Sequence, residues 1–223
     1  MELADDVGLE AAHDLFLGPA LSWSGPLANT AVASLRKTER YASRVDAVGS
    51  RPQVVLFTGL PGTGKSTLAE SVARTVGAPA FAGDWLMGGL EPAHAALGRL
   101  DRADYVAAWF GLLRTLVTRQ LMLDQSAVVD DIVSDSDLAL WRETAEHFAA
   151  RLSLIECICS DEAVHRARLE GRVRGIPGWH EVGWDHVERM RAEMPSLTAD
   201  RLVVDAMEPV EDNLRRVLCY IAA

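Results

Sequence analysis

The residues with the clearest chemical pattern form one stretch, Gly59-Leu60-Pro61-Gly62-Thr63-Gly64-Lys65-Ser66. The stretch fits the pattern G-x-x-x-x-G-K-[ST] without a mismatch, and an apolar run precedes it while a helical pattern follows it. The glycines let the backbone curl so that successive N–H groups point inward, where they can bind phosphate oxygens. We therefore predict that this loop, together with the next residue, Thr67, binds the phosphates of a nucleotide.

The lysine and the serine of this loop have separate expected roles. Lys65 would place a mobile positive charge on the β- and γ-phosphates, and the Ser66 hydroxyl would be a ligand of Mg²⁺. Of the 22 lysine and arginine residues in the chain, only Lys37 and Lys65 are lysines. A compact ammonium fits a tight loop in which the wide planar guanidinium of arginine would not. The presence of a lysine at position 65, in a chain that otherwise uses arginine almost throughout, therefore supports a phosphate site.

Acidic residues follow two of the predicted strands. Asp84 comes after the second strand, and parallel sheets gather ligand groups at the carboxyl ends of their strands. Asp84 is therefore a candidate for orienting and deprotonating an acceptor hydroxyl, with a helix N-cap as the structural alternative. Asp130 and Asp131 end the third strand, and one of them is expected to hold Mg²⁺. Strand alternation should turn only one of the two toward the nucleotide, and the sequence does not choose between them.

Arginines gather in the segment 168–182. Arg168 and Arg172 are four residues apart and would share a helical face, with Arg174 close by. A solvated basic face is the simplest interpretation of such a run. The sequence GIPGW that follows offers glycine hinges, however, and favours a lid that brings Arg168 and Arg172 over the transferring phosphoryl group.

Short apolar runs alternate with helical patterns from residue 51 onward. Strands are predicted at 53–58, 78–83, 126–133, 153–160 and 201–206. Helices are predicted at 65–76, 103–123, 137–152, 161–174 and 209–222. Such alternation requires crossover connections, so we expect an α/β fold of three layers: a parallel sheet flanked by helices on both faces, as in P-loop NTPases. Residues 1–50 break this rhythm and predict a separate N-terminal helical extension, either packed on the core or serving as a lid or dimer arm.

Composition excludes several classes of protein. The chain has 223 residues, 49% of them hydrophobic, and a formal net charge of −10. This charge argues against a general binder of nucleic acid or anionic membranes, because phosphate groups would be repelled. No apolar run has membrane-spanning length, the N-terminus lacks the pattern of a signal peptide, and three cysteines show no metal-ligand spacing. We expect a cytoplasmic protein whose partner is a small molecule.

Several motifs resemble those of the small phosphate-loop kinases, the group that includes gluconate kinase, chloramphenicol phosphotransferase, polynucleotide 5′-hydroxyl kinase and the zeta toxins. GDWL (83–86) is similar to an element after the second strand of gluconate-kinase-like enzymes, and VVDDIV (128–133) to the paired acids of chloramphenicol phosphotransferase. RLEGRVRG (168–175) resembles their arginine-bearing lid, and VVDAMEPVED (203–212) their last strand and base-binding loop. The segment 174–191 resembles predicted AAA-type kinases of the same superfamily.

This resemblance implies an ATP- and Mg²⁺-dependent kinase domain over residues 51–223, with Asp84 as the base for a hydroxyl of a small sugar-like or antibiotic-like acceptor. Two alternatives stay open: a kinase of nucleosides or of nucleic-acid 5′-hydroxyls, and a toxin-type or switch-type ATP-binding protein. The acceptor pocket would lie between Asp84 and the helix predicted at 103–123, with aromatic and apolar walls from Trp85, Met87, Tyr105 and Trp109. Oligomerisation through the N-terminal helices is a further hypothesis.

Overall fold

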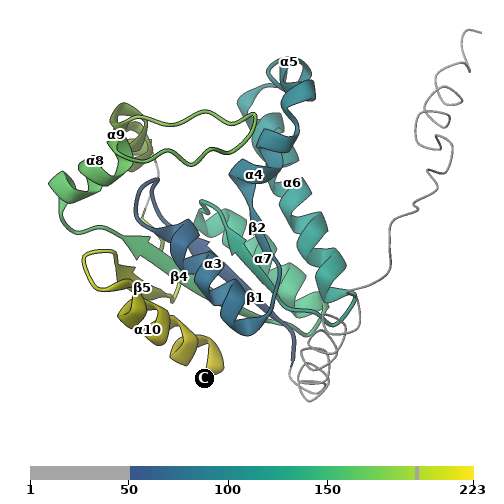
Figure 1. Ribbon diagram of the computed structural model, residues 1–223. Coiled ribbons are helices and arrows are strands. Elements are labelled where there is room, and N and C mark those ends of the chain that lie inside the picture. Colours follow the sequence, from purple (N-terminus) through teal and green to yellow (C-terminus); the bar gives the residue numbers. More distant parts are fainter. Residues whose placement is uncertain (1–50, 194–195) are drawn as a thin grey trace, which may run out of the picture. The chain divides into compact units, whose positions relative to one another are not determined.

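A parallel sheet forms the centre of the domain (Figure 1). A computed structural model describes residues 51–193 and 196–223, so the helices predicted in 1–50 lie outside the described residues. The strands are β1 (Gln53–Thr58), β2 (Ala80–Ala82), β3 (Ala127–Asp130), β4 (Arg151–Ile158) and β5 (Leu202–Asp205). Their order is β2-β3-β1-β4-β5, and every neighbouring pair is parallel. The five predicted strands and their parallel arrangement are confirmed.

Helices cover both faces of the sheet, as predicted (Figure 1). The expected helices are α3 (Lys65–Val76), α6 (Arg102–Leu121), α7 (Asp135–His147), α8 (Glu162–Glu170) and α10 (Val210–Ala222). Four further helical segments had no prediction: α4 (Gly83–Gly89), the 3₁₀ turn η1 (Glu91–Ala93), α5 (His94–Leu97) and α9 (Trp184–Glu193). In the part of the chain that the structure describes, no helix is both long and apolar enough to cross a bilayer.

The alternation of β1 explains how the sheet is held between two helical layers. Val54 and Leu56 project into one hydrophobic core with side chains of α6 and α7, and Val55 and Phe57 project into the other with side chains of α3 and α10. All four are at most 2% exposed. Removing a side chain of this size from water stabilises the fold by about 1.5–3 kcal/mol. The central strand is therefore fixed on both faces, and its carboxyl end has a defined position.

The glycine-rich helix α4 shows why the segment after β2 was difficult to predict. The sequence of 87–100 suggests a movable glycine-rich wall, and the structure has helical turns over most of it. Glycine weakens an isolated helix by about 1 kcal/mol per residue relative to alanine, so propensity does not favour α4. Met87 and Gly88 are buried, however, and α4 packs against α6 and β2. Tertiary packing stabilises this helix.

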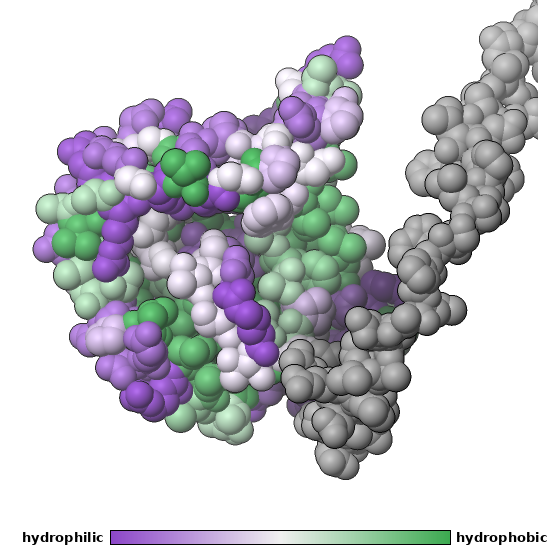
Figure 2. Space-filling model, in the orientation of Figure 1, coloured by the Kyte–Doolittle hydropathy of each residue, from purple (hydrophilic) through white to green (hydrophobic). Residues whose placement is uncertain are grey.

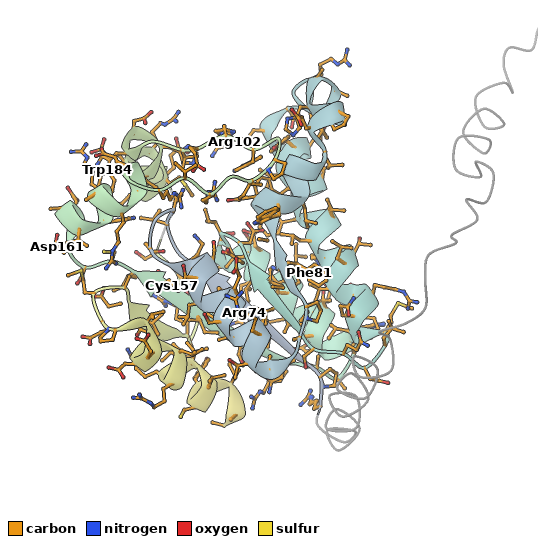
Figure 3. All side chains as sticks on the ribbon, viewed as in Figure 1. Arg74, Phe81, Arg102, Cys157, Asp161 and Trp184 are labelled. Atoms are coloured by element: carbon orange, nitrogen blue, oxygen red, sulfur yellow. The ribbon has the colours of Figure 1, made fainter. Side chains whose placement is uncertain are left out.

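The turn after β1 brings the backbones of two strands unusually close. Gly59 follows β1 with φ of 133°, a conformation that side chains rarely adopt. A Cβ at this position would lie 2.1 Å from the carbonyl oxygen of Cys157, which is on the neighbouring strand β4 (Figure 3). Only glycine fits here. The close approach fixes where the phosphate loop leaves the sheet.

Replacing Gly59 tests this constraint. Gly59→Ala should lower the free energy of unfolding by more than about 2 kcal/mol, because the methyl group collides with rigid backbone at a strained φ. Gly111→Ala is the control: Gly111 is exposed within α6 and has no atom within 4 Å of an added Cβ. That change should raise the free energy of unfolding by about 0.5–1 kcal/mol. Equal stabilities in urea unfolding curves would contradict the packing described here.

Candidate active site

A cavity of about 410 Å³ opens at the carboxyl ends of β1 and β3, beneath the segment that carries α8 and α9. Figure 2 shows hydrophilic residues gathered over this segment, with a hollow below it. The predicted site residues that line the cavity are Pro61, Gly62, Gly64, Lys65, Ser66, Thr67, Asp84, Asp130, Asp131, Arg168 and Arg172. The other loop residues, Gly59, Leu60 and Thr63, do not line this cavity, and Thr63 lines a second cavity. The structure therefore brings together side chains from three strand ends and from the arginine segment.

A second cavity, of about 540 Å³, lies on the other side of the same loop. The two cavities share Gly62, Gly64, Thr67 and Arg168. The far wall of the second cavity comes from the segment between β5 and α10, the segment predicted to bind the nucleotide base. A phosphate chain lying along the loop would therefore connect a larger cavity to a smaller one.

Hydrogen bonds within the loop hold its inner turn. The carbonyl oxygen of Leu60 accepts from the Thr63 hydroxyl at 2.8 Å and from Lys65 Nζ at 3.3 Å. Thr63 is buried, and Lys65 is half-buried at the start of α3. The ammonium therefore lies against the loop carbonyl and borders the cavity, where an anion could replace this weak contact.

His165 supports the loop from outside, a role that the sequence does not reveal. Its Nε2 lies 2.8 Å from the carbonyl oxygen of Pro61, which can only accept, so Nε2 carries the hydrogen. His165 is 1% exposed, and its ring makes an edge-to-face contact with Trp184 at 5.1 Å. A lone histidine on α8 gives no local signal, because its partner is more than one hundred residues earlier in the sequence.

Two of the cavity-lining arginines, Arg168 on α8 and Arg172 just beyond its end, have unequal partners. Arg172 Nε and Nη2 are buried without a hydrogen bond, and the nearest carboxylate oxygen, on Glu181, is 3.8 Å from Nε. Burial, and then the charge of Arg174, lower the pKa of Arg172. Buried charged donors without acceptors are costly, so this guanidinium is suited to an incoming anion. Arg168 instead donates to the Ala206 carbonyl at 2.9 Å, between the two cavities.

The helical face predicted for Arg168 and Arg172 is wrong. Helix α8 ends at Glu170, and Gly171 follows it, so Arg172 lies outside the helix. Both arginines nevertheless line the cavity, because the chain turns back over it after the helix. Gly171 interrupts the helical pattern of the sequence, so the helix predicted at 161–174 was about one turn too long.

Asp84 lies in the first turn of α4 and does not cap the helix through its side chain. Its Oδ2 is in contact with Arg174 Nη1, which also borders the cavity. The pair joins α4 to the arginine segment and is partly buried. The carboxylate thus faces the phosphate loop across the same space, with an arginine as its present partner.

Both acids at the end of β3 line the cavity. The strand ends at Asp130, and the expectation that only one of the two side chains faces the nucleotide stays a prediction. Asp131 is 8% exposed and accepts hydrogen bonds from the Ile132 N–H at 2.8 Å and from Trp109 Nε1 at 3.1 Å. Burial raises the pKa of Asp131 to about 7, although these hydrogen bonds oppose the shift.

The oxygen ligands at this edge fit the chemistry of Mg²⁺. Ser66 and Asp130 border the same cavity, and a hard divalent cation prefers hydroxyl, carboxylate, phosphate and water oxygens. Among residues 51–193 and 196–223, no group of three or more His, Cys, Asp or Glu side chains could hold a metal alone. The residues therefore fit an ion that takes most of its ligands from phosphate and water. Asp130 is the better candidate, because both oxygens of Asp131 already accept hydrogen bonds.

Residues 54–197 match a protein family described as the AAA domain. The match spans more than half of the chain. The chain belongs to the AAA domain family. No curated protein matches its sequence.

Solved structures share the fold of this AAA domain at low sequence identity. A gluconokinase from Sinorhizobium meliloti 1021 is 20% identical, with a TM-score of 0.58 over 77% of this chain and 92% of its own. An APS kinase from Mycobacterium tuberculosis is 18% identical, with a TM-score of 0.53 over 78% and 99%. A shikimate kinase from Aquifex aeolicus vf5 is 15% identical, with a TM-score of 0.52 over 76% and 96%. The predicted resemblance to small phosphate-loop kinases is confirmed at the level of fold.

The aromatic wall of the AAA domain cavity differs from the prediction. Trp109 lines the cavity and contacts Trp179 edge to face at 5.4 Å, a partner that no sequence pattern indicated. Tyr105 contacts Trp109 but does not line the cavity. Trp85 is 53% exposed, and Met87 is in the interior. Neither of these two residues of α4 lines the cavity.

The environment of Asp131 predicts a titration near neutral pH in the absence of Mg²⁺ and nucleotide. Below pH 7 the carboxyl is protonated and accepts a weaker hydrogen bond from Trp109, so the indole N–H signal should move upfield in NMR spectra. The midpoint should lie near pH 7 and the shift should be absent in Asp131→Asn. A midpoint near pH 4, or no titration between pH 5 and 9, would contradict a buried, desolvated Asp131.

Proposed function

We propose that this AAA domain is an ATP- and Mg²⁺-dependent phosphotransferase that moves the γ-phosphate to a hydroxyl group of a small molecule in the cytoplasm. One observation supports this proposal above the others: Asp84 borders the same cavity as Lys65 and Ser66 of the phosphate loop. A base for an alcohol and a cradle for phosphate thus face one another. Their arrangement suits in-line transfer between two bound substrates.

ATP would extend across both cavities. The nucleoside would occupy the cavity of about 540 Å³ beside the segment between β5 and α10, and the phosphates would lie along Gly62 to Thr67. The N-terminus of α3 adds a partial positive charge where the phosphates would lie. Arg168 belongs to both cavities and is suited to the bridge between nucleoside and phosphates.

Each side chain has a defined task in the proposed transfer. Lys65 binds the β- and γ-phosphates after releasing the Leu60 carbonyl. Arg172 supplies hydrogen bonds to the transferring group, and its buried nitrogens gain the acceptors that they lack. Asp84 orients the acceptor hydroxyl and takes its proton as the oxygen attacks. Ser66 and Asp130 would hold Mg²⁺, which neutralises charge on the phosphate oxygens.

The structural neighbours support this class of reaction. Their names identify them as a gluconokinase, an APS kinase and a shikimate kinase, and the APS kinase was solved with AMPPNP and APS. These names refer to kinases of small molecules. The Trp109–Trp179 wall also favours a compact acceptor over a long polynucleotide, because its aromatic surfaces lie close together inside the cavity.

The proposal predicts that Asp84→Asn abolishes transfer while ATP still binds. The amide cannot accept the hydroxyl proton, so turnover should fall by about 10²–10⁴-fold. The test measures ATP-dependent phosphorylation by mass spectrometry across sugars, hydroxy acids, aminocyclitol and phenicol antibiotics, nucleosides and a 5′-hydroxyl oligonucleotide. ATP affinity, measured by calorimetry, should change by no more than about threefold.

Asp104→Asn is the matched control, because Asp104 is an exposed carboxylate on α6 that does not line the cavity. It should retain wild-type turnover. Phosphorylation of the oligonucleotide alone would replace the small-molecule acceptor with a nucleic-acid 5′-hydroxyl. Undiminished transfer by Asp84→Asn would remove Asp84 from the mechanism.

A further inference from the structure

The base proposed for the acceptor is paired with an arginine of the same chain. Arg174 Nη1 contacts Asp84 Oδ2, and the side chains of the two residues are only 19% and 33% exposed. A partly buried ion pair is less screened by solvent than a surface pair. One partner lies on α4, and the other lies after α8 in the arginine segment. The pair therefore links the two sides of the cavity directly at the candidate base.

Glu181 positions this arginine independently of Asp84. Its Oε1 accepts from the Arg174 backbone N–H at 2.8 Å, and its Oε2 lies 3.4 Å from Arg174 Nε. Burial alone would raise the pKa of Glu181, but the hydrogen bonds and charge of Arg174 lower it below its usual range. The strap formed by residues 174–182 thus holds its own arginine in the orientation that reaches Asp84.

Close backbone packing brings this strap onto the helix that carries the base. A Cβ on Gly178 would lie 2.4 Å from the Gly88 carbonyl oxygen, and a Cβ on Gly88 would lie 2.3 Å from that of Pro177. Ile176, between these residues and Arg174, is buried. The strap and α4 therefore touch through backbone, which leaves the ion pair little freedom to drift apart.

From this arrangement we infer that Arg174 is a specificity-determining residue, which withholds Asp84 from water until an acceptor hydroxyl displaces it. The inference rests on the proposed function, because it concerns the same base. A carboxylate free in a cavity that holds ATP could activate water as readily as an alcohol. Arg174 Nη1 occupies Asp84 Oδ2. An acceptor that contacts the aromatic wall gains binding free energy there, and this can offset the loss of the Arg174–Asp84 ion pair. A water molecule gains no such binding free energy.

The reaction that Arg174 suppresses is ordinary hydrolysis. The oxygen of water would bond to the γ-phosphorus while the bond from that phosphorus to the β,γ-bridging oxygen breaks. ADP leaves with the electron pair of the broken bond, inorganic phosphate forms, and the proton of water passes to Asp84 and then to solvent. Every component is supplied by ATP and water. Hydrolysis without acceptor is therefore a direct measure of how well Asp84 is withheld.

The test measures phosphate release from ATP by the full-length protein without acceptor. Arg174→Gln keeps much of the side-chain volume but cannot form the ion pair, and it should raise hydrolysis by at least about tenfold, within the range of a positioned general base. Arg174→Lys retains the charge and should give a smaller rise. The double variant Asp84→Asn/Arg174→Gln should lose the rise that Arg174→Gln shows, since the released base is gone.

Arg102→Gln is the matched control. Arg102, at the start of α6 (Figure 3), pairs with Glu193 of α9 at 3.1 Å, so it also joins two separate elements, but it neither touches Asp84 nor lines the cavity. Its hydrolysis should equal that of the wild type. A rate in Arg174→Gln no higher than in the wild type would overturn the inference. So would an equal rise in Arg102→Gln, or a rise that persists in the double variant.

The acceptor panel separates this inference from the proposed function. If the wild type phosphorylates an acceptor and Arg174→Gln leaves hydrolysis unchanged, the role of Arg174 fails while the kinase assignment stands. If no hydroxyl is phosphorylated but Arg174→Gln hydrolyses ATP faster through Asp84, the result supports the role of Arg174 in keeping water from Asp84. The same result contradicts the proposal of an alcohol acceptor. Thermal melts of each variant confirm that the rates belong to folded protein.

Discussion

The close contact between Gly59 and the carbonyl of Cys157 determines the position of the whole site. Because this contact leaves no room for a side chain, the chain leaves β1 in one direction and forms the loop that ends in α3. His165 then fixes the other side of the loop by donating to the Pro61 carbonyl. Lys65 and Ser66 follow directly, so backbone geometry rather than side-chain freedom places both groups at the cavity.

Several charged groups of the cavity have partners within the chain. Asp84 is paired with Arg174, Asp131 accepts two hydrogen bonds and has a raised pKa, and Glu181 holds one arginine while lying near another. Two nitrogens of Arg172, by contrast, are buried without a hydrogen bond. A transferring phosphoryl group would supply those acceptors. The cavity thus has an electrostatic preference for the anionic ligand that the loop is shaped to bind.

The elements defined by local chemistry were predictable from the sequence. The phosphate loop, the five strands and helix α3 follow from glycine spacing and apolar periodicity, and α3 has the predicted bounds. Helix α4 was not predictable in this way, since its glycines disfavour a helix and only burial against α6 and β2 stabilises it. The contacts between site residues were not predictable from local sequence either. His165 with Pro61, Glu181 with Arg174 and Trp109 with Trp179 are contacts between separate elements, which no local pattern encodes.

The central claim is that the loop binds the phosphates of ATP through Lys65, and a calorimetric titration with Mg-AMPPNP tests it most directly. Wild type should bind with one site per chain, and Lys65→Ala should bind about 10–100-fold more weakly, the expected loss of a charged hydrogen bond. The matched control is Lys37→Ala, which removes the only other lysine and should bind as the wild type does. Equal affinity in Lys65→Ala, with an unchanged thermal melt, would contradict the account.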